Sequence, residues 1–255
     1  MRRLIGFACE GETLAATLDE APGTTGLLIV SGGNEIRSGA HRGMAILAQR
    51  LAATGTPVFR YDRRGVGDST GHNGGFLSAE PDLIAAAAAF RNAAPNVTRL
   101  IGFGNCDAAS TLALFGRSAG FDKVVLANPW VIEPIDDLPP AAAIRAHYRT
   151  ALRDPATWRR ALSGKLNFTN LIKGLLRIVQ TDQESRNPLA SRVLTAIAAW
   201  QTDAAVILAR GDATAIAFAA AAGAAVPSET IDTDSHSFTG PAAAALETAL
   251  RRNLA

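Results

Sequence analysis

Short runs of consecutive apolar residues alternate with helical patterns along most of this chain. The runs are too short for buried helices, and they lack the apolar-polar alternation of a strand with one face in water. Five of them predict buried strands, at residues 27–30, 57–61, 99–103, 123–127 and 204–209. Between the first two runs, apolar residues recur at helical spacing over 44–53, and Gly55 follows as a cap. This order predicts an α/β fold with a mostly parallel central sheet flanked by helices.

The alternation is interrupted between residues 129 and 200, where prolines separate helical pieces and no buried strand is evident. The amphipathic stretch 171–179 has too much apolar surface for a solvated linker. We therefore expect one α/β core made of residues 1–128 and 201–255, with 129–200 inserted as a helical lid. A chain of 255 residues is long enough for one such core, although two small domains are compatible with this length.

Composition and charge narrow the class of protein. Hydrophobic residues make up 48% and charged residues 19%, which is typical of a globular protein, and a net charge of +2 gives no reason to expect a nucleic-acid partner. No stretch approaches the roughly 20 apolar residues of a membrane span, and the start of the chain lacks the apolar region of a signal peptide. Two cysteines, Cys9 and Cys106, do not suggest a secreted disulfide scaffold. We expect a cytoplasmic protein with reduced thiols.

The apolar run at 99–103 is followed by a sharp turn into a helix, with Cys106 on the turn. Gly104 and Cys106 follow the Gly-x-Ser-x-Gly pattern of a nucleophile turn, with cysteine in place of serine and Ala108 in place of the last glycine. An imidazolium or a helix N-terminus favours the nucleophilic thiolate. A lone cysteine is more often a core residue, but strand, turn and helix together favour a nucleophile. Cys9 has no such surroundings, and we expect it to be structural.

The general base and its acid partner are expected later in the chain, because this kind of turn is followed by an acid and then a histidine. Four histidines are candidates: His41, His72, His147 and His236. Only His236, which follows the expected last strand, satisfies the order. Asp212 follows the strand at 204–209 and is the predicted acid, which orients the imidazole and stabilises its charged form.

The loop after residues 27–30 is expected to complete an oxyanion hole. The backbone N–H of Gly33 or Asn34 would pair with the N–H of Asp107 to stabilise developing negative charge.

Three further residues are candidate substrate contacts: His41, Arg42 and Trp130. For the first two, solvated polar residues at a helix start are an equally good interpretation. Metal-ligand clusters, a phosphate loop and a complete dinucleotide fingerprint are absent from the sequence, so we expect no metal and no cofactor.

Four motifs together point to a known family. The stretch Asp62-Arg-Arg-Gly-Val-Gly-Asp-Ser69 is similar to the Asp-x-Arg-Gly-x-Gly-x-Ser segment of α/β-hydrolases. With Gly104-Asn-Cys-Asp-Ala-Ala-Ser110, Ala127-Asn-Pro-Trp130 and Trp158-Arg-Arg-Ala-Leu-Ser-Gly-Lys165, nearly the whole chain resembles the exosortase A system-associated hydrolases. Those are bacterial proteins encoded with exopolysaccharide and protein-sorting machinery. The resemblance implies an α/β-hydrolase fold and a cysteine nucleophile, without a settled substrate.

These features predict a hydrolase of carboxylic esters or thioesters. A small-molecule substrate would transfer its acyl group to Cys106 and so form an acyl-enzyme. Acyl transfer to another acceptor, such as a saccharide hydroxyl, would use the same residues. A non-catalytic binding homologue is a third possibility, which the complete set of nucleophile, acid and base disfavours. Residues 141–180 hold eight basic residues and one acidic residue, which predicts either contact with anionic substrate groups or a solvated face. The sequence carries no signal for an oligomeric state.

Overall fold

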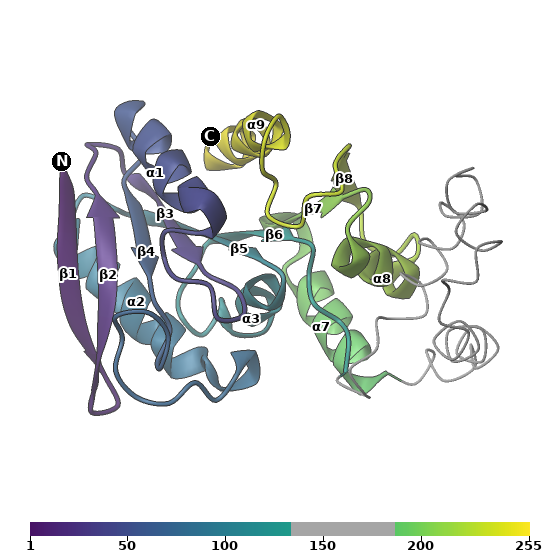
Figure 1. Ribbon diagram of the computed structural model, residues 1–255, viewed down its shortest axis with the longest axis horizontal. Coiled ribbons are helices and arrows are strands. Elements are labelled where there is room, and N and C mark those ends of the chain that lie inside the picture. Colours follow the sequence, from purple (N-terminus) through teal and green to yellow (C-terminus); the bar gives the residue numbers. More distant parts are fainter. Residues whose placement is uncertain (134–186) are drawn as a thin grey trace, which may run out of the picture.

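The computed structural model describes residues 1–133 and 187–255, and these form an α/β structure around one sheet (Figure 1). The strands are β1 (Arg2–Cys9), β2 (Glu12–Asp19), β3 (Thr25–Val30), β4 (Val58–Tyr61), β5 (Arg99–Asn105), β6 (Lys123–Ala127), β7 (Ala204–Ala209) and β8 (Ser228–Ile231). Their order across the sheet is β1-β2-β4-β3-β5-β6-β7-β8. The pairs from β4 to β8 are parallel, whereas β2 is antiparallel to both β1 and β4. The predicted mostly parallel sheet is confirmed.

Helices cover both faces of the sheet (Figure 1). They are α1 (Gly43–Ala53), α2 (Glu80–Ala93), α3 (Asp107–Phe115), α7 (Pro188–Ala199), α8 (Ala213–Ala222) and α9 (Ala242–Leu254). Apolar side chains of α1 and α9 pack on one face, and those of α2, α3, α7 and α8 pack on the other. Because every central strand is buried on both faces, its apolar run is continuous rather than alternating.

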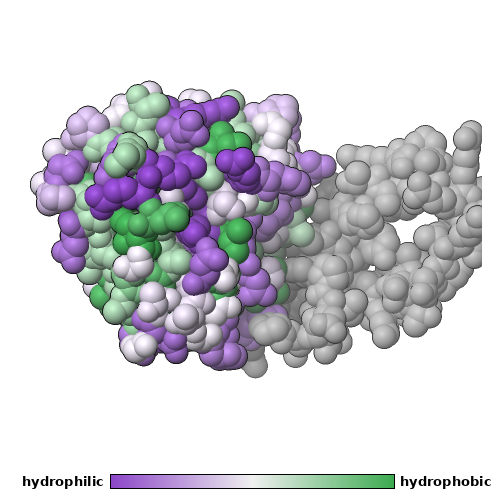
Figure 2. All heavy atoms as spheres, turned by 60° about the vertical axis from the view of Figure 1, so that its left-hand side comes forward, coloured by the Kyte–Doolittle hydropathy of each residue, from purple (hydrophilic) through white to green (hydrophobic). Residues whose placement is uncertain are grey.

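The edge strand β1 differs from the central strands because most of its side chains are exposed. Figure 2 turns this side of the molecule forward and shows small hydrophobic groups set among hydrophilic side chains. Leu4 of β1 is one of the exposed large apolar residues. A strand of this kind lacks the continuous apolar run that identifies β3 to β7.

Helix α7 lies within residues 129–200, the range expected to form the lid. Its residues Val193 and Ile197 are buried in the same apolar core as α3, and Trp200, which follows the helix, donates from Nε1 to the carbonyl of Ala113 at 3.0 Å. This end of the range therefore packs on the core. Residues 134–186, which include most of the expected lid and its basic residues, lie outside the described residues, and the lid stays a prediction.

The segment after β4 anchors the loop that follows β3. The carboxylate of Asp62 is fully buried and accepts hydrogen bonds from the backbone N–H groups of Arg37 at 2.5 Å and Asp68 at 3.1 Å, and from the Arg37 guanidinium. Arg64 pairs with the carboxylate of Asp82 at 2.6 Å. The motif at residues 62–69, which resembles a segment of α/β-hydrolases, thus has a structural role in this chain. Its carboxylate, that of Asp62, holds the loop after β3 in place.

Candidate active site

Cys106 lies on the turn between β5 and α3 with φ 64° and ψ −129°. A non-glycine residue with positive φ is uncommon, and on a strand-to-helix turn it is typical of a nucleophile elbow. Gly104 is required by close packing, since a Cβ there would lie 2.7 Å from the backbone of Ala108. Cys106 itself is half-buried, so its sulfur is not sealed in the core.

His236 and Asp212 reach the same edge of the sheet from the loops after β8 and β7. The imidazole Nδ1 lies 2.8 Å from Asp212 Oδ1, and Cys106 is near enough to the ring to raise the pKa of His236. Since Nδ1 faces Asp212, Nε2 is the ring nitrogen left for the sulfur of Cys106. Asp212 Oδ2 accepts from the backbone N–H of Ala215 at 2.9 Å, so the carboxylate also caps α8. The structure thus brings together the three residues predicted from the order of the sequence.

The hydrogen bonds of His236 change which of its forms is stable. The bond with Asp212 and then the bond with Cys106 raise the pKa of His236 to about 10, against the opposing effect of burial. Burial acts to raise the pKa of Asp212, but hydrogen bonds from His236 and Ala215 outweigh it and hold that pKa below its ordinary value. Both shifts favour the form in which an imidazolium lies beside a carboxylate.

Two residues predicted to supply oxyanion donors, Gly33 and Asp107, are hydrogen-bonded to each other, which the sequence did not indicate. The N–H of Gly33 donates to Asp107 Oδ1 at 2.7 Å, so this amide already has an acceptor. Arg63, which is buried, donates to the carbonyl of Gly33 and lies 3.4 Å from Asp107 Oδ2. This differs from the prediction that Gly33 supplies a free donor, because the carboxylate that follows the nucleophile is held against the loop. The N–H of Asn34 has no acceptor in the part of the chain that the structure describes.

The three candidate substrate contacts have different surroundings. His41 and Arg42 are exposed and both have positive φ, in a short turn that leads into α1. Trp130 is half-buried, and its backbone N–H donates to the carbonyl of Cys106 at 3.2 Å. Trp130 is therefore beside the nucleophile, while the other two lie at the surface of the loop after β3.

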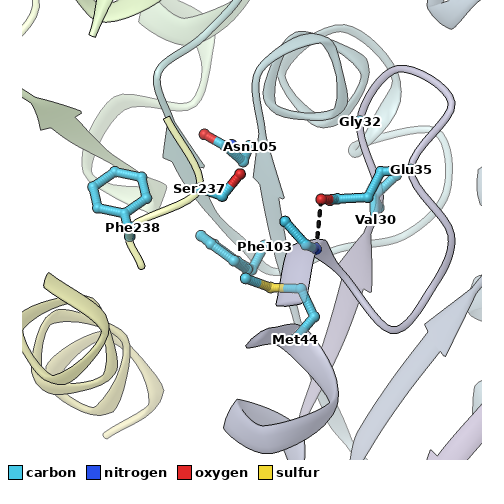
Figure 3. A pocket seen from close by; sticks show the side chains of 9 residues that line it. Val30, Gly32, Glu35, Met44, Phe103, Asn105, Ser237 and Phe238 are labelled. Carbon is cyan, nitrogen blue, oxygen red and sulfur yellow. Dashed lines mark hydrogen bonds between the residues drawn. The ribbon is translucent and has the colours of Figure 1, made fainter. Parts of the chain in front are cut away.

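Figure 3 shows a small hollow between the loop after β3, the end of β5 and the loop that follows β8. Phe103, Met44 and Phe238 form its apolar wall, and Asn105 and Ser237, which adjoin Cys106 and His236, line it as well. Its main charged group is Glu35, whose carboxylate accepts from the backbone N–H of Ala40 at 2.7 Å (Figure 3). Sequence reasoning did not find this hollow, because its walls come from four segments that only the fold brings together.

Two asparagines that sequence reasoning also missed surround the carbonyl oxygen of His236. Asn105 donates to it from Nδ2 at 3.0 Å, and Asn128 donates to it at 3.3 Å. They bond to each other as well, from Asn128 Nδ2 to Asn105 Oδ1 at 3.0 Å. The only signal available in the sequence was their place, since each amide ends or follows an apolar strand at the edge that carries the nucleophile.

Residues 1–133 and 187–255 contain neither a cluster of metal ligands nor a helix that could span a membrane. No group of three or more histidine, cysteine or carboxylate side chains there is arranged to hold a metal ion. None of the helices in these ranges is both long and apolar enough to cross a bilayer.

Solved structures resemble this one over its whole length. The α/β-hydrolase GrgF from Penicillium has a TM-score of 0.62 and 16% sequence identity, over 100% of this chain and 98% of that chain. The fold is that of the α/β-hydrolases. Other structures with this fold are the esterase Pf2001 of Pyrococcus furiosus (TM-score 0.63, 14% identity, 100% and 89% covered) and the thioesterase domain from the curacin biosynthetic pathway (0.59, 12%, 98% and 99%). No protein-family profile and no curated protein sequence matches the chain.

In an α/β-hydrolase fold, the nucleophile stands on a strand-to-helix turn, and the acid and base follow it along the chain. Cys106, Asp212 and His236 have these places in the described structure, at the ends of β5, β7 and β8. The agreement of chain order with the contact between His236 and Asp212 is what makes this cluster the candidate active site of the α/β-hydrolase fold.

Proposed function

We propose that this protein hydrolyses carboxylic esters or thioesters through an acyl-enzyme on Cys106. The observation that carries the proposal is the imidazole of His236, which is hydrogen-bonded to Asp212 and whose pKa is raised by Asp212 and by Cys106 nearby. An imidazolium beside a thiol favours the thiolate, which is the reactive form. Asp212 would keep the ring oriented and stabilise its charge without taking the proton.

The reaction has two halves in this proposal. Cys106 Sγ attacks the carbonyl carbon, and the leaving alcohol or thiol takes a proton from His236 as the tetrahedral intermediate collapses to an acyl-enzyme thioester. The neutral imidazole then takes a proton from water, whose oxygen attacks the thioester carbonyl. Collapse of the second intermediate releases the carboxylic acid and restores the sulfur and imidazolium pair.

The oxyanion of both intermediates needs donors near Cys106. The N–H of Asp107 is suited to bind the oxyanion, because the first N–H groups of a helix have no partner within the helix and lie at the positive end of its dipole. The N–H of Asn34, without an acceptor in the described ranges, is the better second donor, since that of Gly33 is held by Asp107. Each such donor is typically worth roughly 10²- to 10³-fold in kcat.

The hollow in Figure 3 marks the side of the site from which an acyl group could approach. Its lining includes Phe103, Met44 and Phe238, together with Asn105 and Ser237, which are the chain neighbours of Cys106 and His236. Structures of the same fold include proteins named as an esterase and a thioesterase domain, which fits this substrate class. The motifs that resemble those of the exosortase A system-associated hydrolases are a further reason to propose acyl chemistry on a cysteine. The two cysteines without a disulfide scaffold are the reason to propose a cytoplasmic protein.

The proposal predicts that an ester and a thioester of the same acyl group react through one common intermediate. Added hydroxylamine should intercept that intermediate, and the ratio of hydroxamate to free acid should be the same for both substrates, because the leaving group has already departed. Mass spectrometry of the products measures the ratio. A ratio that depends on the leaving group would contradict a common acyl-enzyme.

The same assay separates hydrolysis from acyl transfer. Free acid as the main product in water alone supports hydrolysis. Slow release of the alcohol or thiol that saccharides accelerate, with acylated saccharide in place of free acid as the product, would instead favour transfer to a hydroxyl acceptor.

A further inference from the structure

Asn128 lies immediately after β6 and bonds to all three neighbouring elements of the site. Its backbone N–H donates to the carbonyl of Ile207 at 2.9 Å, and its Oδ1 accepts from the N–H of Ala209 at 2.8 Å, so it extends the pairing of β6 with β7. Its Nδ2 donates to Asn105 Oδ1 and to the carbonyl of His236. The side chain is fully buried, and its Nδ2 and Oδ1 both have partners inside the protein.

The backbone of Asn128 explains why an asparagine is suited to this position. Its φ is 42°, in the left-handed region, which asparagine tolerates better than most non-glycine residues. Glycine would tolerate the backbone but would supply no amide. The position thus requires both a left-handed turn and a side chain with one acceptor and two donors.

Each partner of this network is next to a residue of the proposed triad. Asn105 precedes Cys106, Ala209 ends the strand that leads to Asp212, and the carbonyl that receives both amides belongs to His236. The bonds reach the backbone of His236 and leave its ring free for Asp212 and Cys106. Their effect is therefore on where the ring lies rather than on its charge.

We propose that Asn128 and Asn105 are positioning residues, which hold the backbone of His236 so that its ring bridges Asp212 and Cys106. This inference rests on the proposed function of the site. A displacement of about 1 Å in a catalytic group is enough to lower a rate roughly 10²-fold. Both amides donate to the same carbonyl oxygen, and the bond between them orients the pair, so loss of either donor weakens the hold on that carbonyl.

Substitution of either asparagine by aspartate removes the amide donors and keeps an acceptor oxygen. Asn105→Asp keeps an oxygen for Asn128 Nδ2 and removes the donor to the His236 carbonyl, with almost no change in size. Asn128→Asp likewise keeps the acceptor for Ala209 and removes both donations. Asn96→Asp is the matched control, because Asn96 also donates to a backbone carbonyl, that of Gly23 at 2.7 Å, but is exposed and precedes β5, at the opposite end of this strand from Cys106.

The test measures two rates in each variant: ester turnover, and alkylation of Cys106 by iodoacetamide at pH 7. For Asn105→Asp we expect kcat to fall about 10²-fold with KM changed less than about twofold, and alkylation to slow by roughly tenfold, because the sulfur loses its imidazolium partner. Asn105→Ala should behave in the same way, which excludes an effect of the added charge. Asn96→Asp should match the wild type in both rates.

The two readouts keep this inference separate from the proposed function. Alkylation needs no ester, so it reports the contact of His236 with Cys106 even in a protein that hydrolyses none of the esters tried. If Asn128→Asp fails to fold, the half-buried Asn105 still gives the answer. A folded Asn105→Asp that is alkylated as fast as the wild type would overturn the positioning role, whatever its turnover.

Discussion

Cys106→Ala is expected to abolish ester and thioester hydrolysis, with kcat lower by roughly 10⁴-fold or more. The substitution removes the only atom that forms the covalent intermediate, while Ala fits the elbow in place of a half-buried side chain. Because the base and the oxyanion donors act together with the nucleophile, they are left with little to catalyse. Steady-state kinetics with a chromogenic ester, together with a thermal unfolding curve, separate lost chemistry from lost folding.

Cys9→Ala is the matched control for this experiment. The thiol of Cys9 is buried 3.5 Å from the carboxylate of Asp82, and burial followed by that negative charge raises its pKa to about 11. A thiol of this kind is a poor nucleophile at neutral pH. We expect Cys9→Ala to keep wild-type kcat. A Cys106→Ala protein that still turns over at more than a few per cent of the wild-type rate would assign the chemistry to another group.

Asp212→Asn is expected to lower kcat by roughly 10⁴-fold, with a loss of stability at pH 7 that comes from the lost charge pairing with His236. An asparagine can donate to Nδ1 of His236, which leaves the hydrogen on Nε2 and removes the base that faces Cys106. The other role of Asp212 survives, because an amide oxygen can still accept from Ala215 and cap α8. Kinetics should therefore show a large loss of rate, whereas urea unfolding should show a much smaller loss in the free energy of unfolding.

Two companion variants sharpen the result for Asp212. Asp212→Ala removes the cap as well, so we expect the same loss of rate and a further loss of about 1 kcal/mol in stability. Asp232→Asn changes an exposed carboxylate close to His236 in the chain, which pairs with Arg210 at 3.2 Å, and it should leave kcat unchanged. A larger effect of Asp232→Asn than of Asp212→Asn would show that the acid had been assigned to the wrong loop.

The sequence predicted the central strands because each is buried on both faces and has a continuous apolar run, as in β3 and β6. The hairpin of β1 and β2 was not anticipated, since β1 lies at the edge and most of its side chains are exposed. Local pattern reports burial, and an edge strand is held mainly by backbone pairing that side chains do not reveal.

The candidate triad was predictable for a different reason. Chain order places Cys106, Asp212 and His236 after three parallel strands, β5, β7 and β8, whose carboxyl ends share one edge. The bond from Gly33 to Asp107 and the amides around the His236 carbonyl were not predictable, because each joins loops that are far apart in the sequence. Strand order determines which residues meet, but the partner of each amide depends on side-chain geometry within an ångström.

The most direct test of the account is acylation of Cys106 followed by intact-mass spectrometry, in the wild type and in His236→Ala. With an activated acyl ester at pH 7, the wild type should gain one acyl group, located on Cys106 by peptide mapping. In His236→Ala the same adduct should form at least about tenfold more slowly, because an unassisted thiol is only a few per cent thiolate at this pH. Equal rates of acylation in the two proteins would contradict the account, since Cys106 would then be an exposed thiol that His236 does not activate.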